Sequence, residues 1–102
     1  MGNALHCAFS GKLDGFTCSE IEQELLSHTT LFRENCKDAQ LVFDLTEVVF
    51  ISSSFLRLCL IHHRTFGKSS FTVRNVSKEI RDVFHISGFA AIMNIIPADE
   101  AA

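Results

Sequence analysis

One segment constrains the fold more than any other: residues 41–56, with the sequence LVFDLTEVVFISSSFL. Its first part, together with the two residues before it, is AQLVFDL at 39–45, an almost continuous apolar run broken by one aspartate. Such runs are typical of strands covered on both faces, as in parallel sheets flanked by helices. Three consecutive serines, Ser52, Ser53 and Ser54, then precede a helical pattern. We therefore expect a buried strand that passes into a helix at these serines.

A helix after the serines is indicated by residues that recur at steps of three and four. These residues are Leu56, Cys59, Leu60 and His63. The pattern stops at Gly67, and glycine is a common residue at helix ends. The segment thus has the length and spacing of one amphipathic helix.

The rest of the chain alternates in the same way. Further strands are expected at residues 4–11, 69–75 and 90–96, the last ended by Pro97, with helices between them. This order implies an α/β fold with a largely parallel sheet and right-handed crossovers. Functional sites in such sheets usually gather where strands lead into helices. The serine triplet lies at such a junction.

The first and third helices carry their own boundary signals. Residues 11–15, GKLDG, are typical of a turn. Beyond the turn, Thr17 and Ser19 each have a glutamate three residues later, so two capping boxes compete for the start of the first helix. Ser77 can cap the third helix, and Gly88 is a natural stop for it.

Length and charge exclude several classes of protein. A chain of 102 residues fits one domain with a single core. The net charge of -3 and the scattered Lys and Arg argue against a nucleic-acid binder. No apolar run approaches the ~20 residues of a membrane span and no export signal is present, so we expect a cytoplasmic protein without direct membrane insertion. The four cysteines show no Cys-x-x-Cys pairing, which favours free thiols.

The serine triplet allows three interpretations. Ser52 can cap the helix, its hydroxyl accepting from a backbone N–H two or three residues on. A nucleophilic serine is the second, but no Gly-x-Ser-x-Gly motif is present and nothing marks any histidine as its base. The third is phosphorylation of Ser54, in the first helical turn, where free N–H groups and the helix dipole favour a phosphate by ~0.3–1 kcal/mol. A phosphate there would not melt the domain, so its effect would lie at an interface.

Metal and cofactor sites receive little support from the sequence. Cys59, His62 and His63 lie close together on the second helix, where Cys59 and His63 can share a face, so that only two ligands converge. A metal ion needs three or four ligands, so we expect no metal site. Without a Gly-rich phosphate loop, no cofactor is expected either. Arg57, one turn from the serines, can pair with a phosphate or remain solvated.

The phenylalanines fall into two groups. Phe55 lies beside the serines and Phe89 lies just past a helix stop, and exposed rings at these positions would form a patch suited to binding. The other group is most simply explained as core: Phe43, Phe50, Phe66, Phe71 and Phe84.

Two longer segments, LVFDLTEVVFISSSFLRLCL and FTVRNVSKEIRDVFHISGF, together resemble the STAS domain of bacterial anti-sigma factor antagonists. In that family, a buried strand ending in Asp-Leu leads through V-x-F-(I/M) to an Asp-Ser-Ser-Gly-Leu motif that opens a helix. N-V-S-x-E-(I/V) and S-G-(F/L) segments recur later in the family. The resemblance covers about residues 4–96. It implies one STAS domain over residues 1–102, with a mostly parallel sheet of four to five strands flanked by helices.

The resemblance also implies a non-catalytic, protein-binding regulator. Members of this family bind an anti-sigma factor and so free a sigma factor. The same anti-sigma factor acts as an ATP-dependent serine kinase that phosphorylates them, and the ATP and magnesium belong to that partner. Ser53 and Ser54 fall on the two serines of the motif. The second of these, Ser54, would be the phosphoacceptor, with Ser53 and Ser52 as alternatives.

The partner-binding face implied by the resemblance combines the turn before the first helix, the start of the second helix and the end of the third. Its residues would be Asp14, Ser52, Ser53, Ser54, Phe55, Arg57, Ser87, Gly88 and Phe89.

The chain departs from the family motif at two positions. Ser52 takes the place of the aspartate, and it can cap the helix as an aspartate would. Phe55 takes the place of the glycine, and its ring can obstruct the usual kinase or anchor a different partner. An alternative is therefore a STAS interaction subunit without a phosphorylation cycle, attached to a lipid-transport ATPase or a larger signalling assembly. A serine hydrolase that uses Ser54 is the third hypothesis.

Overall fold

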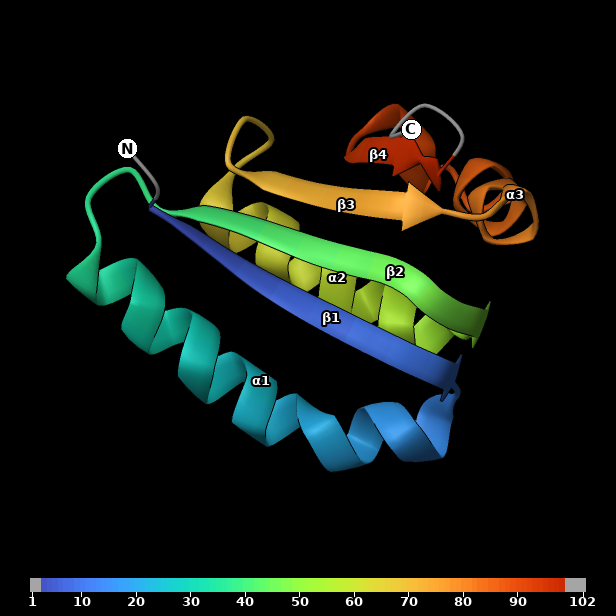
Figure 1. Cartoon of the computed structure of the whole chain (residues 1–102), viewed down its shortest axis with the longest axis horizontal. Helices are drawn as coiled ribbons and strands as arrows, with labels where there is room; N and C mark the ends of the chain where they lie inside the picture. Colours follow the sequence, from blue (N-terminus) through green and yellow to red (C-terminus); the bar gives the residue numbers. More distant parts are fainter. Residues whose placement is uncertain (1–2, 99–102) are drawn as a thin grey trace.

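The computed structural model describes residues 3–98. Within them the chain alternates strands and helices in the predicted order (Figure 1). The elements are β1 (Ala4–Leu13), α1 (Gly15–Asn35), β2 (Gln40–Ile51), α2 (Ser53–Phe66), β3 (Phe71–Val76), α3 (Lys78–Ile86), a 3-10 helix η1 (Phe89–Ala91) and β4 (Asn94–Pro97).

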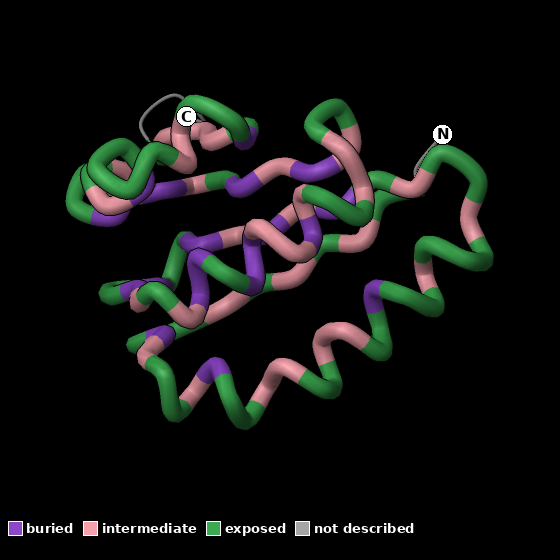
Figure 2. The backbone as a smooth tube through the Cα atoms, turned by 180° about the vertical axis from the view of Figure 1, so that it is seen from behind, coloured by how far each residue is buried: buried purple, intermediate pink, exposed green. Residues whose placement is uncertain are grey.

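The four strands of the described residues form one all-parallel sheet in the order β1-β2-β3-β4, which confirms the predicted α/β fold. Because spatial order equals chain order, right-handed crossovers carry the helices to the same side of the sheet. Figures 1 and 2 show α2 on one side, with α1 running beside β1. The helices α1 and α2 pack against each other, α1 packs against β1, and α2 packs against β2 and β3.

Burial alternates along β2, as expected for a sheet covered on one face. Leu41, Phe43 and Leu45 are buried, whereas Val42 and Asp44 between them are only half-buried. The expectation that this strand is covered on both faces is therefore wrong. Val42 makes the apolar run continuous, and this run led to the expectation of two covered faces. Burial does not follow, because β-branched residues are also favoured on half-exposed strand faces.

A cluster of aromatic rings fills the space between the sheet and α2. The ring of Phe43 lies 4.9 Å from that of Phe9 and 5.0 Å from that of Phe71, both edge-on. Such T-shaped pairs are a preferred arrangement of aromatic side chains. The predicted burial of Phe43, Phe71 and Phe84 is confirmed, and Phe66 is half-buried.

Phe50, also predicted to lie in the core, is 48% exposed, so this prediction is wrong. The reason is a register shift between β1 and β2: Gly11 pairs with Val48, but the next residue, Lys12, pairs with Phe50. Val49 is thus an extra residue in β2, and such a bulge re-aims the side chains that follow it.

The start of α1 differs from the prediction. β1 continues to Leu13, and α1 begins at Gly15 with Asp14 as its N-cap, whose Oδ1 accepts from the Thr17 N–H at 2.9 Å. The capping boxes predicted at Thr17 and Ser19 are therefore wrong, because both residues lie inside the helix. The turn predicted at residues 11–15 is reduced to the cap itself.

The predicted boundaries of α3 are largely confirmed. The Ser77 hydroxyl accepts from the Ile80 N–H at 3.3 Å, and Gly88, with a φ of +85°, follows the end of the helix. A positive φ favours glycine at this position. The last strand is shorter than predicted: β4 covers Asn94–Pro97, since the chain first forms η1.

Candidate functional site

The serine triplet lies beside the start of α1. Leu13 and Ile51 are paired at the carboxyl ends of β1 and β2, and the chain enters α1 and α2 directly after them. Gly15 is so close that a Cβ built on it would stand 3.6 Å from the Ser54 Oγ. Two helix N-termini, each with backbone N–H groups that have no partner within their own helix, thus meet at this edge of the sheet.

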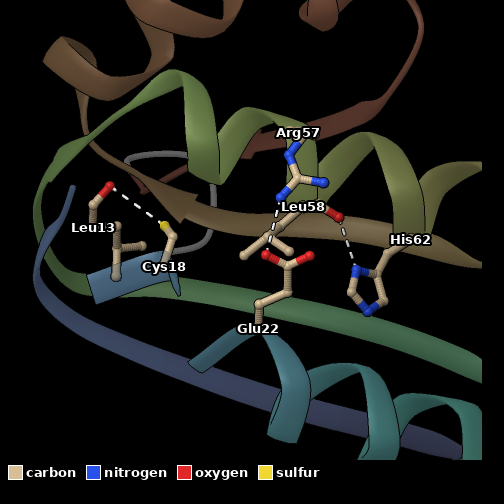
Figure 3. A network of polar contacts seen from close by, with 6 residues as sticks. All are labelled: Leu13, Cys18, Glu22, Arg57, Leu58 and His62. Carbon is tan, nitrogen blue, oxygen red and sulfur yellow. Dashed lines mark hydrogen bonds and ion pairs between the residues drawn. The ribbon is translucent and has the colours of Figure 1, made fainter. Parts of the chain in front are cut away.

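Ser52 occupies the N-cap position of α2, but its side chain makes no cap hydrogen bond, so the predicted capping contact is wrong. Its hydroxyl instead donates to the Leu13 carbonyl at 2.8 Å, and its backbone N–H donates to the same oxygen at 3.1 Å. The Cys18 thiol also points at this oxygen, at 3.7 Å (Figure 3). The Leu13 carbonyl belongs to the last residue of β1, and the two hydrogen bonds from Ser52 satisfy it as an acceptor.

The other two serines differ in their surroundings. Ser53 is exposed to solvent, whereas Ser54 is half-buried. Ser54 lines a small cleft of about 150 Å³ between the first two turns of α1 and of α2. We call this the Ser54 cleft, and its lining residues are Gly15, Cys18, Ser19, Glu22, Ser54 and Arg57.

Arg57 connects the two helices at the Ser54 cleft. Its Nη2 donates to the Glu22 Oε1 at 2.9 Å, a contact from α2 to α1 that Figure 3 shows. The two side chains are 57% and 29% exposed, respectively. Arg57 is therefore paired with Glu22, a partner that the sequence did not indicate, and its pairing with a phosphate stays a prediction.

Phe55 does not contribute a ring to the surface. It is 0% exposed, and its ring lies 5.3 Å from that of Phe9 and 6.1 Å from that of Phe43. The predicted exposure of Phe55 as a partner anchor is wrong, because position 55 falls on the inward face of α2 with Leu58 and His62. Phe55 therefore acts in the core.

The segment at the end of α3 lies outside the Ser54 cleft. Ser87 and Gly88 are exposed, and the Ser87 hydroxyl donates to the Phe84 carbonyl at 3.1 Å. Phe89 was predicted to be exposed, but it is half-buried and packs against the core. The α3 helix packs chiefly against η1, β2 and β4 rather than on α1. The structure thus does not bring this segment into the cleft with the serines.

Asp14 is half-buried at the start of α1, next to Gly15 of the Ser54 cleft. The hydrogen bond from the Thr17 backbone N–H lowers the pKa of the Asp14 carboxyl below its usual value. Asp14 therefore carries a negative charge that is already satisfied by the helix it caps.

Sequence reasoning missed three exposed apolar side chains at this end of the molecule. Phe16, in the first turn of α1, is 73% exposed. At the end of β2, Val49 is 69% exposed and Phe50 is 48% exposed. A bulge in β2 exposes Val49 and Phe50. No residue type in the sequence indicates this bulge, so the exposure of the two side chains could not be predicted. The sequence predicted that the first helix starts at Thr17 or Ser19. Phe16 was therefore not recognised as a residue of its first turn.

The cysteine and histidines of α2 differ in their surroundings: Cys59 and His62 are buried in the core, whereas the buried Nδ1 of His63 has no hydrogen-bond partner among the described residues. Cys59 is buried, which raises the pKa of its thiol well above the usual value. His62 is buried as well, with Nδ1 2.8 Å from the Leu58 carbonyl and Nε2 3.0 Å from the Thr29 hydroxyl. Among residues 3–98, no three metal-ligating side chains of the His, Cys, Asp and Glu types converge. No helix in this range combines the length and apolarity that a membrane crossing needs.

Comparison with known proteins agrees with this architecture. The family model of the STAS domain matches residues 2–102, which is almost the entire chain. None of the curated proteins matches it. The four parallel strands and the three α-helices of residues 3–98 fit this match. The chain therefore belongs to the STAS domain family.

Proposed function

We propose that this STAS domain is a protein-binding regulator of the anti-sigma factor antagonist type. It binds an anti-sigma factor that is also a serine kinase, and phosphorylation of Ser54 by that kinase ends the binding. The observation that carries this proposal is the position of Ser54. It lies in the first turn of α2, in the same small cleft as the guanidinium of Arg57.

The domain acts as the substrate of this reaction and not as its catalyst. The Ser54 oxygen attacks the γ-phosphorus of ATP held by the kinase, the Oγ–P bond forms, and the bond between that phosphorus and ADP breaks. The hydroxyl proton passes to a base of the kinase, and ADP leaves with the bridging oxygen. The kinase supplies ATP and magnesium.

Ser54 is favoured over its neighbours by its surroundings. The Ser52 hydroxyl is engaged by the Leu13 carbonyl, so phosphorylation there would break a contact at the end of β1. Ser53 is exposed, but it does not line the cleft that holds Arg57. A phosphate on Ser54 adds a charge of about −1.5 to −2 beside the free N–H groups of the helix start, which stabilises it.

The docking surface of this proposal surrounds the serines. Phe16, Val49 and Phe50 are exposed at the same end of the molecule and offer apolar contacts. They replace Phe55 in the partner-binding surface, since that ring is buried. A phosphate brought against an apolar partner surface must lose water, and each ~1.4 kcal/mol of this cost lowers the affinity tenfold.

The test uses the kinase-type anti-sigma factor from the same genome. The domain is incubated with this protein and ATP, and the modified residue is identified by mass spectrometry. The proposal expects one phosphate that is lost in Ser54→Ala and retained in the matched control Ser53→Ala. It also expects phosphorylation to weaken binding at least about tenfold. A phosphate that persists in Ser54→Ala would overturn the assignment.

A STAS interaction subunit without a phosphorylation cycle is the second candidate. It is favoured by the half-burial of Ser54, which a kinase must reach inside a narrow cleft. In this case the partner is a lipid-transport ATPase or a larger signalling assembly, and the exposed apolar side chains carry the contact. Stable binding to such a partner, with Ser54 unmodified after incubation with ATP and the kinase, would favour this candidate over the first.

A further inference from the structure

We propose that Arg57 relays the state of Ser54 to α1: when Ser54 carries a phosphate, the Arg57 guanidinium leaves Glu22 and binds the phosphate. This inference deepens the proposed function and rests on phosphorylation of Ser54. It adds a structural consequence to phosphorylation: α2 carries the phosphate, and Glu22 on α1 loses its ion pair with Arg57.

The positions of the three side chains make this exchange possible without movement of the backbone. Arg57 follows Ser54 by three residues on α2, and residues at this spacing are neighbours on a helix surface. Ser54, Arg57 and Glu22 all line the Ser54 cleft. The Arg57 guanidinium already reaches into this space, with its Nη2 2.9 Å from the Glu22 Oε1. A change of side-chain rotamer is sufficient to turn it from one anion to the other.

The phosphate is the stronger competitor for Arg57. Glu22 offers one negative charge across two helices, and the pair is partly exposed, so water screens it. A phosphoserine offers a charge of about −1.5 to −2 and three acceptor oxygens, and a guanidinium can bind two of them at once. It also lies on the same helix as Arg57, at the N-terminal end, where the helix dipole favours an anion.

The exchange also follows from the charges of the cleft itself. Its lining contains one cation, Arg57, and one anion, Glu22. A phosphate on Ser54 places a second anion in the same cleft of about 150 Å³, where the single guanidinium cannot neutralise both. After the exchange, the Glu22 carboxylate is left unpaired on α1. A partner that contacts both helices then meets new negative charge on each of them.

The experiment does not require a kinase. Phosphoserine is placed at position 54 by genetic encoding, and its second ionisation is followed by ³¹P NMR as a function of pH. The second pKa of a phosphoserine is about 6. We expect Arg57→Gln to raise it by about 0.5 to 1 unit, less than the shifts of one to three units seen beside close cations. Glu22→Gln is expected to lower it, since the competing acceptor is removed.

Arg64→Gln is the matched control, because Arg64 is an exposed arginine near the other end of α2. This variant should leave the phosphate pKa unchanged. An equal pKa in the unsubstituted domain and in Arg57→Gln would overturn the relay, as would an unchanged value in Glu22→Gln. Circular dichroism of each variant shows that the fold is retained, which the partial exposure of both side chains leads us to expect.

This design separates the relay from the proposed function. If no anti-sigma factor phosphorylates Ser54, the function fails, although the encoded phosphoserine can still attract Arg57. If phosphorylation occurs but the second pKa of the phosphoserine is the same with and without Arg57, the relay fails and the proposed function stands.

Discussion

The Thr29 hydroxyl on α1 and the Nε2 of His62 on α2 lie 3.0 Å apart inside the core. Both side chains are almost completely buried. The Nδ1 of His62 lies 2.8 Å from the Leu58 carbonyl (Figure 3). Because a carbonyl can only accept, Nδ1 carries the proton of the neutral ring. Nε2 is then an acceptor, and the single proton of the Thr29 hydroxyl is shared between Nε2 and the Leu26 carbonyl, which lies 3.2 Å from the same hydroxyl oxygen. The two helices are thus joined by a buried hydrogen bond in addition to the pair of Arg57 and Glu22.

Replacing Thr29 with valine tests this buried contact. Valine keeps the shape of threonine but leaves His62 Nε2 without a partner in the core. We expect Thr29→Val to lower the free energy of unfolding by about 1–3 kcal/mol, the cost of an unsatisfied buried polar group. Urea denaturation measures this value. Thr30→Val, at the exposed neighbouring position, should change it by less than about 0.5 kcal/mol. Equal effects of the two variants would contradict the proposed role of the contact.

The same histidine predicts how stability depends on pH. Burial lowers the pKa of His62 below its ordinary value of 6.5. Between the folded and unfolded pKa values the unfolded chain binds more protons, so stability falls as the pH drops below 6.5. The slope from this one group is at most about 1.4 kcal/mol per pH unit. Above 6.5 its contribution is fully present and constant.

Urea denaturation between about pH 7.5 and about pH 5 checks this slope. His62→Gln should flatten the profile, whereas His28→Gln, at an exposed position of α1, should retain it. Asp14 and Asp44 do not interfere. Hydrogen bonds, chiefly from Thr17 and Thr46, lower their pKa values below 3.8, so their contributions are lost only at more acidic pH. A profile that stays unchanged in His62→Gln would show that another group is responsible.

The order of the elements could be predicted from the sequence because each strand and helix has a distinct apolar spacing. The start of α1 could not. Several residues near its start are good caps with similar preferences, namely Asp14, Thr17 and Ser19. In addition, α1 buries little apolar surface, so packing does not indicate where the helix begins. The buried pair of Thr29 and His62 was also missed, since neither residue type is usually buried.

The burial of Phe55 was predictable but was not predicted. It precedes Leu58 and Cys59 by three and four residues, so it shares their inward face. The family motif, with glycine at this position, drew attention to partner contacts instead. The positions of Val49 and Phe50 could not be predicted, because a bulge depends on the pairing of two strands and not on either sequence alone.

Phe55 and Phe50 form a matched pair for measuring this difference. Phe55→Ala removes a ring that packs between Phe9 and Phe43, and we expect a loss of about 3–5 kcal/mol in the free energy of unfolding. Phe50→Ala removes a ring that is 48% exposed, so the loss should be about 1 kcal/mol or less. Partner binding should respond in the opposite order, with Phe50→Ala the more harmful of the two. Stronger impairment of binding by Phe55→Ala, in a variant shown to be folded, would contradict this assignment.

The hydroxyl of Ser52 offers a final test, of what the first serine of the triplet contributes. It donates to the Leu13 carbonyl and makes no cap hydrogen bond, so Ser52→Ala should remove one contact between β1 and the start of α2. We expect a loss of about 1 kcal/mol in stability. Ser52→Asp restores the family residue but should not recover this loss, because a carboxylate has no proton to donate to a carbonyl. Ser53→Ala, at an exposed position, should change stability by less than about 0.5 kcal/mol. If Ser52→Asp proves as stable as the serine, then the helix cap and not the Leu13 contact is what this position requires.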